Sequence, residues 1–341
     1  MTTACYFEYS DDMVQRYKKA GSKVVLCSKE GKRVGGIKGL MFLFVHLRMV
    51  LKMCKPDIVH VQYMAPGAIP IILLKLLGVK TIVATVHTAA DIYPSLKLVH
   101  FIQGYCVKVW TCITQRAEES FFGTSQLYTT DTILKKHNHF TIYNSLPYGM
   151  QLGSSMFQAS NSKKPTTIGV VSRLEYIKGM DLVIPAFAQI KQSHPEISLI
   201  VVGDGSLKEL MQQQAHTLEC CESVHFEGRQ PQEELKKWYG QMDVVLMPSR
   251  SEGFGLTAIE AMANGCVVVA SNVGGLPEIV EDGRVGLLHA NECVDDIVEK
   301  VNVLFDDERM YVKMKEYTQV YAQQYSFVNF SKLFNDLYKK L

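Results

Sequence analysis

Residues 244–265 read V-V-L-M-P-S-R-S-E-G-F-G-L-T-A-I-E-A-M-A-N-G, and this stretch decides the fold. Four apolar residues predict a buried strand that ends at Pro248. A turn with two glycines follows, and a helix is expected from about Leu256 to Gly265. A strand that passes through a tight turn into a helix is the repeating unit of an α/β protein with a parallel sheet.

The same unit recurs along the chain. Short apolar runs at 23–27, 57–62, 81–86, 167–171, 198–202, 243–247 and 266–270 predict buried parallel strands. Longer segments with helical spacing, such as 181–193 and 207–217, lie between them. We therefore expect parallel sheets that helices cover on both faces.

A polar segment divides the chain in two. At 341 residues the chain is too long for one ordinary core, and residues 151–165 are rich in Ser, Asn, Gln and Lys, as linkers are. We expect doubly wound, Rossmann-like α/β domains at 1–150 and 166–326, facing one another across a central cleft. The amphipathic segment 327–341 predicts a closing helix that packs back on the N-terminal domain.

Composition and charge narrow the class of protein. The formal net charge is only +2, too small for the field of a nucleic-acid binder, so no nucleic-acid partner is expected. Nine cysteines without C-x-x-C or Cys/His ligand spacing indicate reduced thiols, not a disulfide framework. The N-terminus lacks a signal-peptide pattern, and the longest apolar run, 40–50, is too short to span a bilayer. We expect a cytoplasmic protein that is soluble or at most lies on a membrane.

The turn at 252–256 has the features of an anion site. Gly253 and Gly255 allow the backbone to approach a ligand closely, and the free N–H groups of the following helix suit a phosphate. Glu252 in the turn and Glu260 on the helix stand eight residues apart. Ionised carboxylates only accept hydrogen bonds, so their expected partners are sugar or ribose hydroxyls.

A second motif follows the strand at 167–171. Residues 172–181 read S-R-L-E-Y-I-K-G-M-D, which places Arg173 and Lys178 at the carboxyl end of that strand. Two cations there could neutralise a diphosphate, the arginine by a forked contact and the lysine as a point charge. Such neutralisation stabilises a departing diphosphate, so no metal and no cofactor are expected.

These motifs resemble those of the retaining glycosyltransferases of family 4, which have the GT-B fold. V-V-G-D-G at 201–205, V-H-F-E-G at 224–228 and N-V-G-G-L-P-E at 272–278 also follow the family's pattern in order and spacing. The resemblance is close from Thr167 to about Leu288 and looser on either side.

The resemblance implies a role for each matching position. Arg173 and Lys178 would hold the donor diphosphate, Glu260 the ribose hydroxyls, and Glu252 the transferred sugar. Arg229 falls where the family binds the base. The sugar and phosphates would meet the backbone of the turn, at Gly253, Phe254, Gly255 and Leu256.

The N-terminal half carries one more candidate. His87 ends the strand at 81–86, where family members have a histidine near the donor sugar; the alternative is a strand-end histidine satisfied by the backbone. His60, in K-P-D-I-V-H, is expected to be structural.

In one respect the sequence departs from the family pattern. No glycine occurs before Gly21, so the usual Gly-rich loop after the first strand, expected at 3–8, is missing.

The implied reaction moves a sugar from a UDP- or GDP-sugar to a hydroxyl of a glycan or lipid-linked acceptor, with retention of anomeric configuration. Surface polysaccharide or glycolipid synthesis is the expected setting. A nucleotide-sugar epimerase or a phosphorylase would need other motifs. A second alternative, a non-catalytic nucleotide-sugar-binding partner subunit, would also keep the donor motifs.

The acceptor would lie mostly on the N-terminal domain. Segments 39–55 and 95–110 are apolar with interspersed lysine and arginine, such as Arg48 and Lys52. Basic amphipathic helices of this kind can lie on an anionic membrane. Burial in the domain core is the alternative for both segments.

Overall fold

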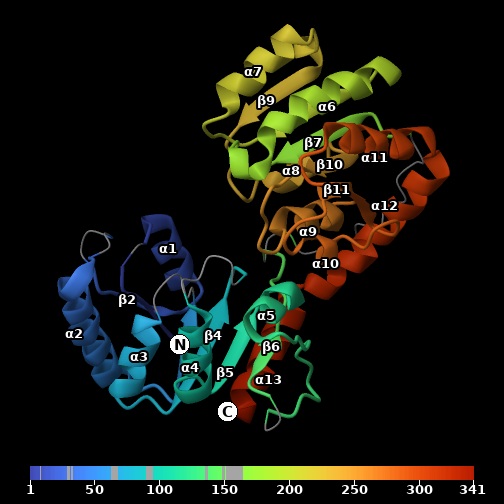
Figure 1. Ribbon diagram of the computed structural model, residues 1–341. Coiled ribbons are helices and arrows are strands. Elements are labelled where there is room, and N and C mark those ends of the chain that lie inside the picture. The colour runs from blue at the N-terminus through green and yellow to red at the C-terminus, as the bar shows by residue number, and fades with distance from the viewer. Residues whose placement is uncertain are drawn as a thin grey trace.

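The computed structural model describes residues 1–7, 9–28, 31, 34–62, 68–89, 95–134, 137–147, 150 and 164–341. The expected linker at 151–165 lies almost wholly outside the described residues. The chain forms two α/β domains, one above the other in Figure 1, and the predicted architecture of two Rossmann-like domains is confirmed.

The C-terminal domain is built on a six-stranded parallel sheet in the order β12-β11-β10-β7-β8-β9. Its strands are β7 (Thr167–Val171), β8 (Ser198–Val202), β9 (Val224–Gly228), β10 (Val244–Met247), β11 (Val267–Ser271) and β12 (Gly286–His289). The helices are α6 (Met180–Ser193), α7 (Lys208–Thr217), α8 (Leu235–Tyr239), α9 (Leu256–Ala263), α10 (Leu276–Ile279), α11 (Val294–Asp306) and α12 (Glu308–Ala322).

Alternate strand residues face the two layers of helices. Val244 and Leu246 of β10 belong to the core beneath α6, α7 and α11, whereas Val245 and Met247 belong to the core beneath α9. Because both faces of the sheet are buried at its centre, β10 is apolar throughout, which is why its position could be predicted from a continuous run.

The N-terminal domain contains two parallel sheets among its described residues. β1 (Thr2–Cys5) pairs with β2 (Lys23–Leu26), and the second sheet has the order β3-β4-β5-β6. Its strands are β3 (Ile58–Gln62), β4 (Thr81–Val86), β5 (Val109–Cys112) and β6 (His139–Thr141). The helices are α1 (Asp11–Lys19), α2 (Gly36–Cys54), α3 (Ile69–Leu76), α4 (Leu96–Tyr105) and α5 (Gln115–Phe122).

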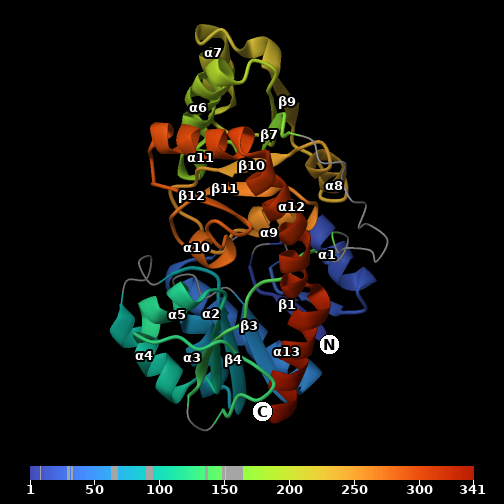
Figure 2. The same ribbon diagram turned by 90° about the vertical axis from the view of Figure 1, so that its right-hand side faces the viewer.

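The last helix, α13 (Phe327–Lys340), joins the two domains. It follows α12 through the short 3-10 helix η5 (Gln323–Tyr325). Figure 2 shows α12 running down the C-terminal domain and α13 continuing down beside the N-terminal domain. Phe334 and Leu337 are buried against Val83, Val109 and Phe140. α13 therefore covers the face of the sheet opposite to the one that α2, α3, α4 and α5 cover.

Two local expectations were wrong. The segment 95–110 is not one helix, because α4 ends at Tyr105 and Val109 and Trp110 already belong to β5. The turn between them contains neither glycine nor proline, so the sequence gives no stop signal there. The first strand ends at Cys5, and not at residue 8.

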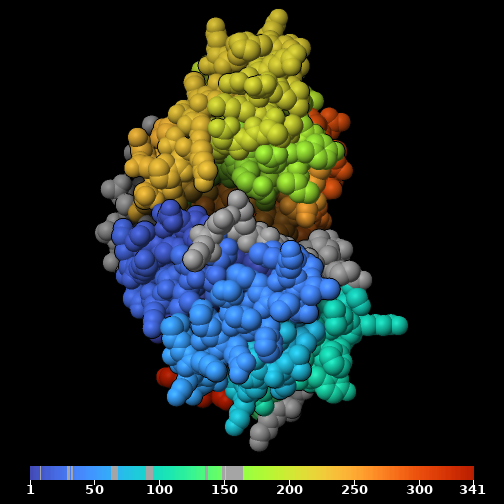
Figure 3. All heavy atoms as spheres, turned by 90° about the vertical axis from the view of Figure 1, so that its left-hand side faces the viewer, coloured from blue at the N-terminus to red at the C-terminus, as the bar shows by residue number. Residues whose placement is uncertain are grey.

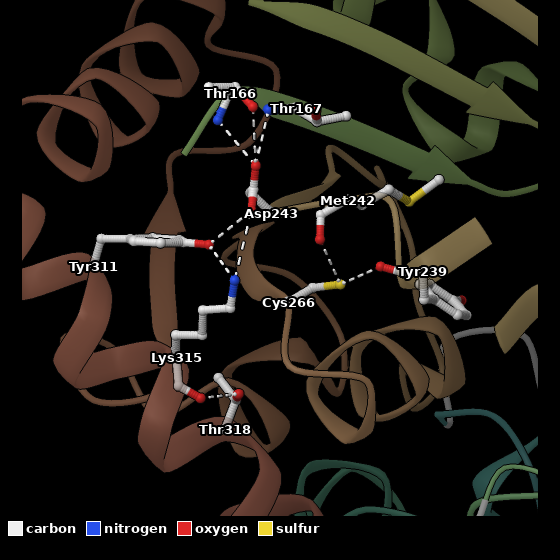
Figure 4. A network of polar contacts seen from close by, with 9 residues as sticks. All are labelled: Thr166, Thr167, Tyr239, Met242, Asp243, Cys266, Tyr311, Lys315 and Thr318. Carbon is white, nitrogen blue, oxygen red and sulfur yellow. Dashed lines mark hydrogen bonds and ion pairs between the residues drawn. The ribbon is translucent and has the colours of Figure 1, made fainter. Parts of the chain in front are cut away.

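A polar network fixes the amino ends of the C-terminal strands (Figure 4). Asp243 accepts hydrogen bonds from the backbone N–H groups of Thr166 (2.9 Å) and Thr167 (3.1 Å) and from the Tyr311 hydroxyl (3.1 Å). The Lys315 ammonium lies 3.6 Å from the same carboxylate. This network ties α12 to the amino ends of β7 and β10, at the opposite end of the sheet from the 252–256 turn.

In the described part of the chain, we find no helix with the length and apolarity that a bilayer crossing requires.

Candidate functional site

The turn after β10 and the loop after β7 meet at one ion pair. Lys178 ends the 3-10 helix η3 (Tyr176–Lys178), and its Nζ lies 2.6 Å from Oε2 of Glu252. Both side chains are mostly buried, so the pair is shielded from solvent. The structure thus brings together two residues, 74 positions apart, that the sequence assigned to the same site.

Glycines allow these loops to pack backbone against backbone. Gly179 has a φ of +68°, and a Cβ there would come within 1.9 Å of the Pro248 carbonyl oxygen. Gly274 has a φ of +56°, and a Cβ there would come within 1.8 Å of the Glu252 carbonyl oxygen. Any side chain at either position would therefore displace the loop that carries Lys178 or Glu252.

Arg250 holds the lysine loop in place. Its guanidinium makes a forked contact with Asp181 (2.7 and 2.8 Å) and donates to the Tyr176 carbonyl oxygen at 2.7 Å. It also lies over the Tyr176 ring, 3.7 Å from the centroid, and its Nε donates to Glu292 at 2.6 Å. The sequence did not predict a role for Arg250. It lies within the stretch 244–265, and its partner Asp181 is the last residue of the 172–181 motif.

The other predicted donor residues differ in exposure. The side chains of Arg173 and Arg229 are exposed at the carboxyl ends of β7 and β9, and neither has an ion-pair partner among the described residues. Leu256 is partly exposed at the first position of α9. The Phe254 ring instead turns into the core, near Tyr143 and Tyr325, which leaves only its backbone available to a ligand.

Glu260 is nearly buried on α9, and its Oε2 accepts a hydrogen bond from the Tyr239 hydroxyl at 3.0 Å. Burial raises the pKa of the Glu260 carboxyl to about 7, although hydrogen bonds from Tyr239 and Gln232 oppose that rise. The carboxyl group therefore changes charge near neutral pH.

His87 lies where the two domains touch. A Cβ at Gly253 would come within 2.8 Å of the His87 carbonyl oxygen, so the 252–256 turn runs directly against the end of β4. His87 Nε2 is 2.9 Å from Oε1 of Gln62, and Gln62 Nε2 is 3.2 Å from His60 Nε2. Burial lowers the pKa of His87, which favours a neutral imidazole at pH 7.

His60 anchors this chain of contacts to the closing helix. Its Nδ1 lies 2.6 Å from the Tyr338 hydroxyl on α13, and its Nε2 lies 2.6 Å from Oγ1 of Thr85. Burial first, and the neighbouring His87 second, lower the pKa of His60 to about 4. Sequence reasoning did not foresee Gln62 as the link between the two histidines.

A carboxylate from the C-terminal domain caps a helix of the N-terminal domain. Glu278 accepts hydrogen bonds from the backbone N–H groups of Gln115 (2.8 Å) and Arg116 (2.7 Å), at the start of α5. The Tyr143 hydroxyl donates to the same carboxylate at 3.3 Å. A carboxylate at a helix N-terminus is favoured by the free N–H groups and the helix dipole, so Glu278 helps to set the relative position of the two domains.

Comparison with known proteins gives two family matches. The model described as glycosyl transferases group 1 matches residues 154–321, and the one described as glycosyl transferase 4-like matches residues 10–115. A D-inositol 3-phosphate glycosyltransferase from Corynebacterium urealyticum is 34% identical over 181 residues, which are 51% of this chain and 43% of that protein. The chain thus matches less than half the length of this relative.

Two further proteins extend the comparison. A GDP-mannose-dependent α-(1-6)-phosphatidylinositol monomannoside mannosyltransferase from Mycolicibacterium smegmatis is 36% identical over 42% of this chain and 40% of its own. The crystal structure of Anabaena HepE with UDP and glucose covers 100% of this chain and 92% of its own, with a TM-score of 0.76 and 19% identity. That structure supports the fold alone. Because the two family models cover both domains and the fold is of the matching type, this chain belongs to the glycosyltransferases with the GT-B fold.

Proposed function

We propose that the protein is a retaining glycosyltransferase of the cytoplasm that moves a sugar from a UDP- or GDP-sugar to a hydroxyl of a glycan or lipid-linked acceptor, in surface polysaccharide or glycolipid synthesis. The observation that carries this proposal is the Lys178–Glu252 pair before the N-terminus of α9, with His87 directly across the domain contact. The names of two relatives support the donor class, since one depends on GDP-mannose and the other was solved with UDP.

Each residue has a role that its surroundings allow. The exposed Arg173 and the mostly buried Lys178 bind the diphosphate, together with the free N–H groups at the start of α9. Glu252 accepts hydrogen bonds from the sugar hydroxyls, and Glu260 from the ribose. Arg229 contacts the base, and the backbone of Gly253, Phe254, Gly255 and Leu256 borders the sugar and the phosphates.

The reaction conserves charge and atoms. The bond between the anomeric carbon and the diphosphate oxygen breaks, and the acceptor oxygen forms the new glycosidic bond on the same face of the sugar. The acceptor proton passes to the departing diphosphate oxygen. Lys178 and Arg173 stabilise the charge that develops on the leaving group, so the proposed step requires no metal ion and no cofactor. His87, neutral at pH 7, positions the sugar.

The test is a thermal-shift screen of the purified chain against UDP- and GDP-sugars, beside Arg173→Ala and Glu260→Ala variants. A donor at about 100 times its dissociation constant stabilises the folded state by roughly 2.7 kcal/mol. We expect one nucleotide class to raise the melting temperature of wild type and of neither variant. Stabilisation of all three proteins alike, or of none, contradicts the proposed donor site.

A second candidate is a non-catalytic subunit that binds nucleotide sugar. The loop after β1 favours it, because this loop carries Tyr6 and Phe7 instead of glycines and the Phe7 ring stacks on Phe42 at 5.8 Å. Incubation of the donor with the purified chain distinguishes the two. Release of nucleoside diphosphate that stops in the Lys178→Ala variant supports the enzyme, and donor binding without any release over a screen of acceptors supports the subunit.

A further inference from the structure

The outward face of α2 is apolar where a surface helix is normally polar. Leu43 and Leu47 pack into the N-terminal core, so the opposite side of the helix points to solvent. That side and its flanks nevertheless carry seven apolar side chains whose exposed fractions lie between 39% and 79%: Ile37, Leu40, Met41, Phe44, Val45, Met49 and Met53. A contiguous apolar surface of this kind marks an interaction site.

The same face carries positive charge only. Lys38, Arg48 and Lys52 are exposed among the apolar side chains, and Lys55 follows the helix. α2 itself contains no aspartate or glutamate. Residues 31–117 as a whole hold eleven lysines and arginines against two acidic residues, although the net charge of the entire chain is only +2. The rest of the chain is therefore acidic, and the cations are concentrated in this part of the N-terminal domain.

The exposed apolar groups and cations of α2 together indicate which kind of partner can bind this face. A second copy of the chain that used the same face would bring cations against cations, because a twofold contact repeats one patch on both sides. An anionic bilayer offers lipid phosphates to the lysines and arginine, and hydrocarbon to the methionine, valine and isoleucine side chains. Of these two occupants, only the anionic bilayer can contact the cations and the apolar side chains of α2 together.

We propose that the outer face of α2 binds the surface of an anionic phospholipid bilayer, with the helix lying in the plane of the headgroups. The structure answers the question that the sequence left open, because segment 39–55 has a buried side and an exposed apolar side at the same time. Figure 3 shows the N-terminal domain in blue on this side of the molecule, beneath a hollow between the two domains. α2 also follows the carboxyl end of β2, the end of a parallel sheet at which such domains bind ligands.

One consequence rests on the proposed function. A glycosyltransferase held in this way would meet an acceptor hydroxyl that belongs to a membrane lipid or a lipid-linked glycan at the inner face of the membrane. Membrane binding itself does not depend on the donor site, so the two proposals can fail separately.

The test is sedimentation of the purified chain with vesicles of phosphatidylcholine alone or with 30 mol% phosphatidylglycerol, taken as about a physiological anionic fraction. We expect binding to the anionic vesicles only, weakened by salt. Neutralising three cations (Lys38→Gln, Arg48→Gln, Lys52→Gln) should lower the partition coefficient roughly a hundredfold, since each contributes about fivefold. A matched variant with three exposed cations of α12 and α13 neutralised (Arg309→Gln, Lys313→Gln, Lys332→Gln) should bind as wild type does.

A second variant tests the apolar half of the surface. Met41→Gln and Val45→Gln together should lower the partition coefficient at least tenfold, and every variant should keep the thermal shift with the nucleotide sugar. Absence of vesicle binding, equal binding to neutral vesicles, or equal losses in the two cation variants overturns the proposal. So does a dimer in sedimentation velocity that the Met41→Gln/Val45→Gln variant dissociates, because the face would then bind a second copy.

Discussion

Lys178 and Glu252 form an ion pair with 2.6 Å between Nζ and Oε2, and both side chains are mostly buried. The lysine that we assign to the diphosphate is thus neutralised by the carboxylate that we assign to the sugar. Donor binding must exchange this contact for one between Lys178 and phosphate. At the same time Glu252 must turn to the sugar hydroxyls, which links occupation of the two subsites.

The Lys178–Glu252 pair predicts that one substitution has opposite effects on nucleotide affinity and on sugar transfer. Glu252→Gln frees Lys178, so the affinity for UDP or GDP without a sugar should rise by about tenfold, since a hydrogen bond to a charged group contributes about 1.5–3 kcal/mol. Sugar transfer should fall by at least tenfold in the same variant. Calorimetric titration and steady-state rates measure the two effects. Glu196→Gln removes an exposed charge elsewhere in the C-terminal domain and should change neither; a lower nucleotide affinity in Glu252→Gln would refute the exchange.

Arg250 positions the lysine loop, and a lysine in its place should not do so. Arg250→Lys keeps the charge but loses the forked contact with Asp181 and the stacking on Tyr176. We expect kcat/KM to fall by roughly ten- to a hundredfold, mostly through weaker donor binding. If the forked contact is the cause, Asp181→Asn should have a similar effect and the double variant should lose less than the sum of the two free energies. Strict additivity would mean that Arg250 acts elsewhere.

Much of the C-terminal half could be predicted because its signals are local. β7 and β8 begin and end at the predicted residues, and α9 begins at Leu256 as expected, since each strand is a continuous apolar run that ends at a Gly-containing turn. Some of the short strands were not predicted. β5, β6 and β12 have three or four residues each and merge with their neighbours in the sequence.

The contacts between loops could not be predicted, because they depend on how distant segments pack. The sequence pointed to Lys178 and Glu252, but not to the ion pair between them. Glu278 belongs to a quoted motif, yet its partners are backbone N–H groups 162 and 163 residues away, which carry no side-chain signature. Gln62 was passed over for the same reason, since an amide at a strand end has many ordinary roles.

Gln62 is predicted to position His87 for the reaction. Gln62→Leu removes the 2.9 Å contact with the imidazole while keeping the size of the side chain. We expect kcat to fall about three- to tenfold, in line with the loss of one hydrogen bond, at unchanged affinity for UDP. In a His87→Ala background the same substitution should have no further effect on kcat. A second, independent loss in that background would show that Gln62 does not act through His87.

Glu278 is predicted to set the position of one domain relative to the other. Glu278→Gln replaces the carboxylate that accepts two N–H groups at the start of α5, so the domain contact should weaken by about 1–3 kcal/mol. Small-angle scattering of the unliganded protein should show a larger radius of gyration, and kcat/KM should fall. Glu281→Gln, three residues further on, is the matched control. Unchanged scattering and unchanged activity in Glu278→Gln would exclude this role.

Glu260 is predicted to make both stability and donor binding depend on pH. Its pKa is raised to about 7 in the folded protein from the ordinary 4.5, so between these values the folded state holds a proton that the unfolded state has lost. The free energy of unfolding should therefore fall as pH rises from about 4.5 through 7, by up to roughly 3 kcal/mol. Donor affinity should change in the opposite direction, because only the ionised carboxylate accepts hydrogen bonds from both ribose hydroxyls.

Glu260→Gln isolates this group. The variant should have a flatter stability profile between pH 5 and 8 than wild type and should be the more stable protein at pH 8, because it buries no charge there. Its weaker binding of the nucleotide sugar should not vary with pH over the same range, whereas wild-type binding should strengthen through about pH 7. Thermal unfolding and calorimetric titration at each pH measure the two profiles. Parallel curves for wild type and Glu260→Gln would show that another group titrates, and Glu260 would then keep only a structural role beside Tyr239.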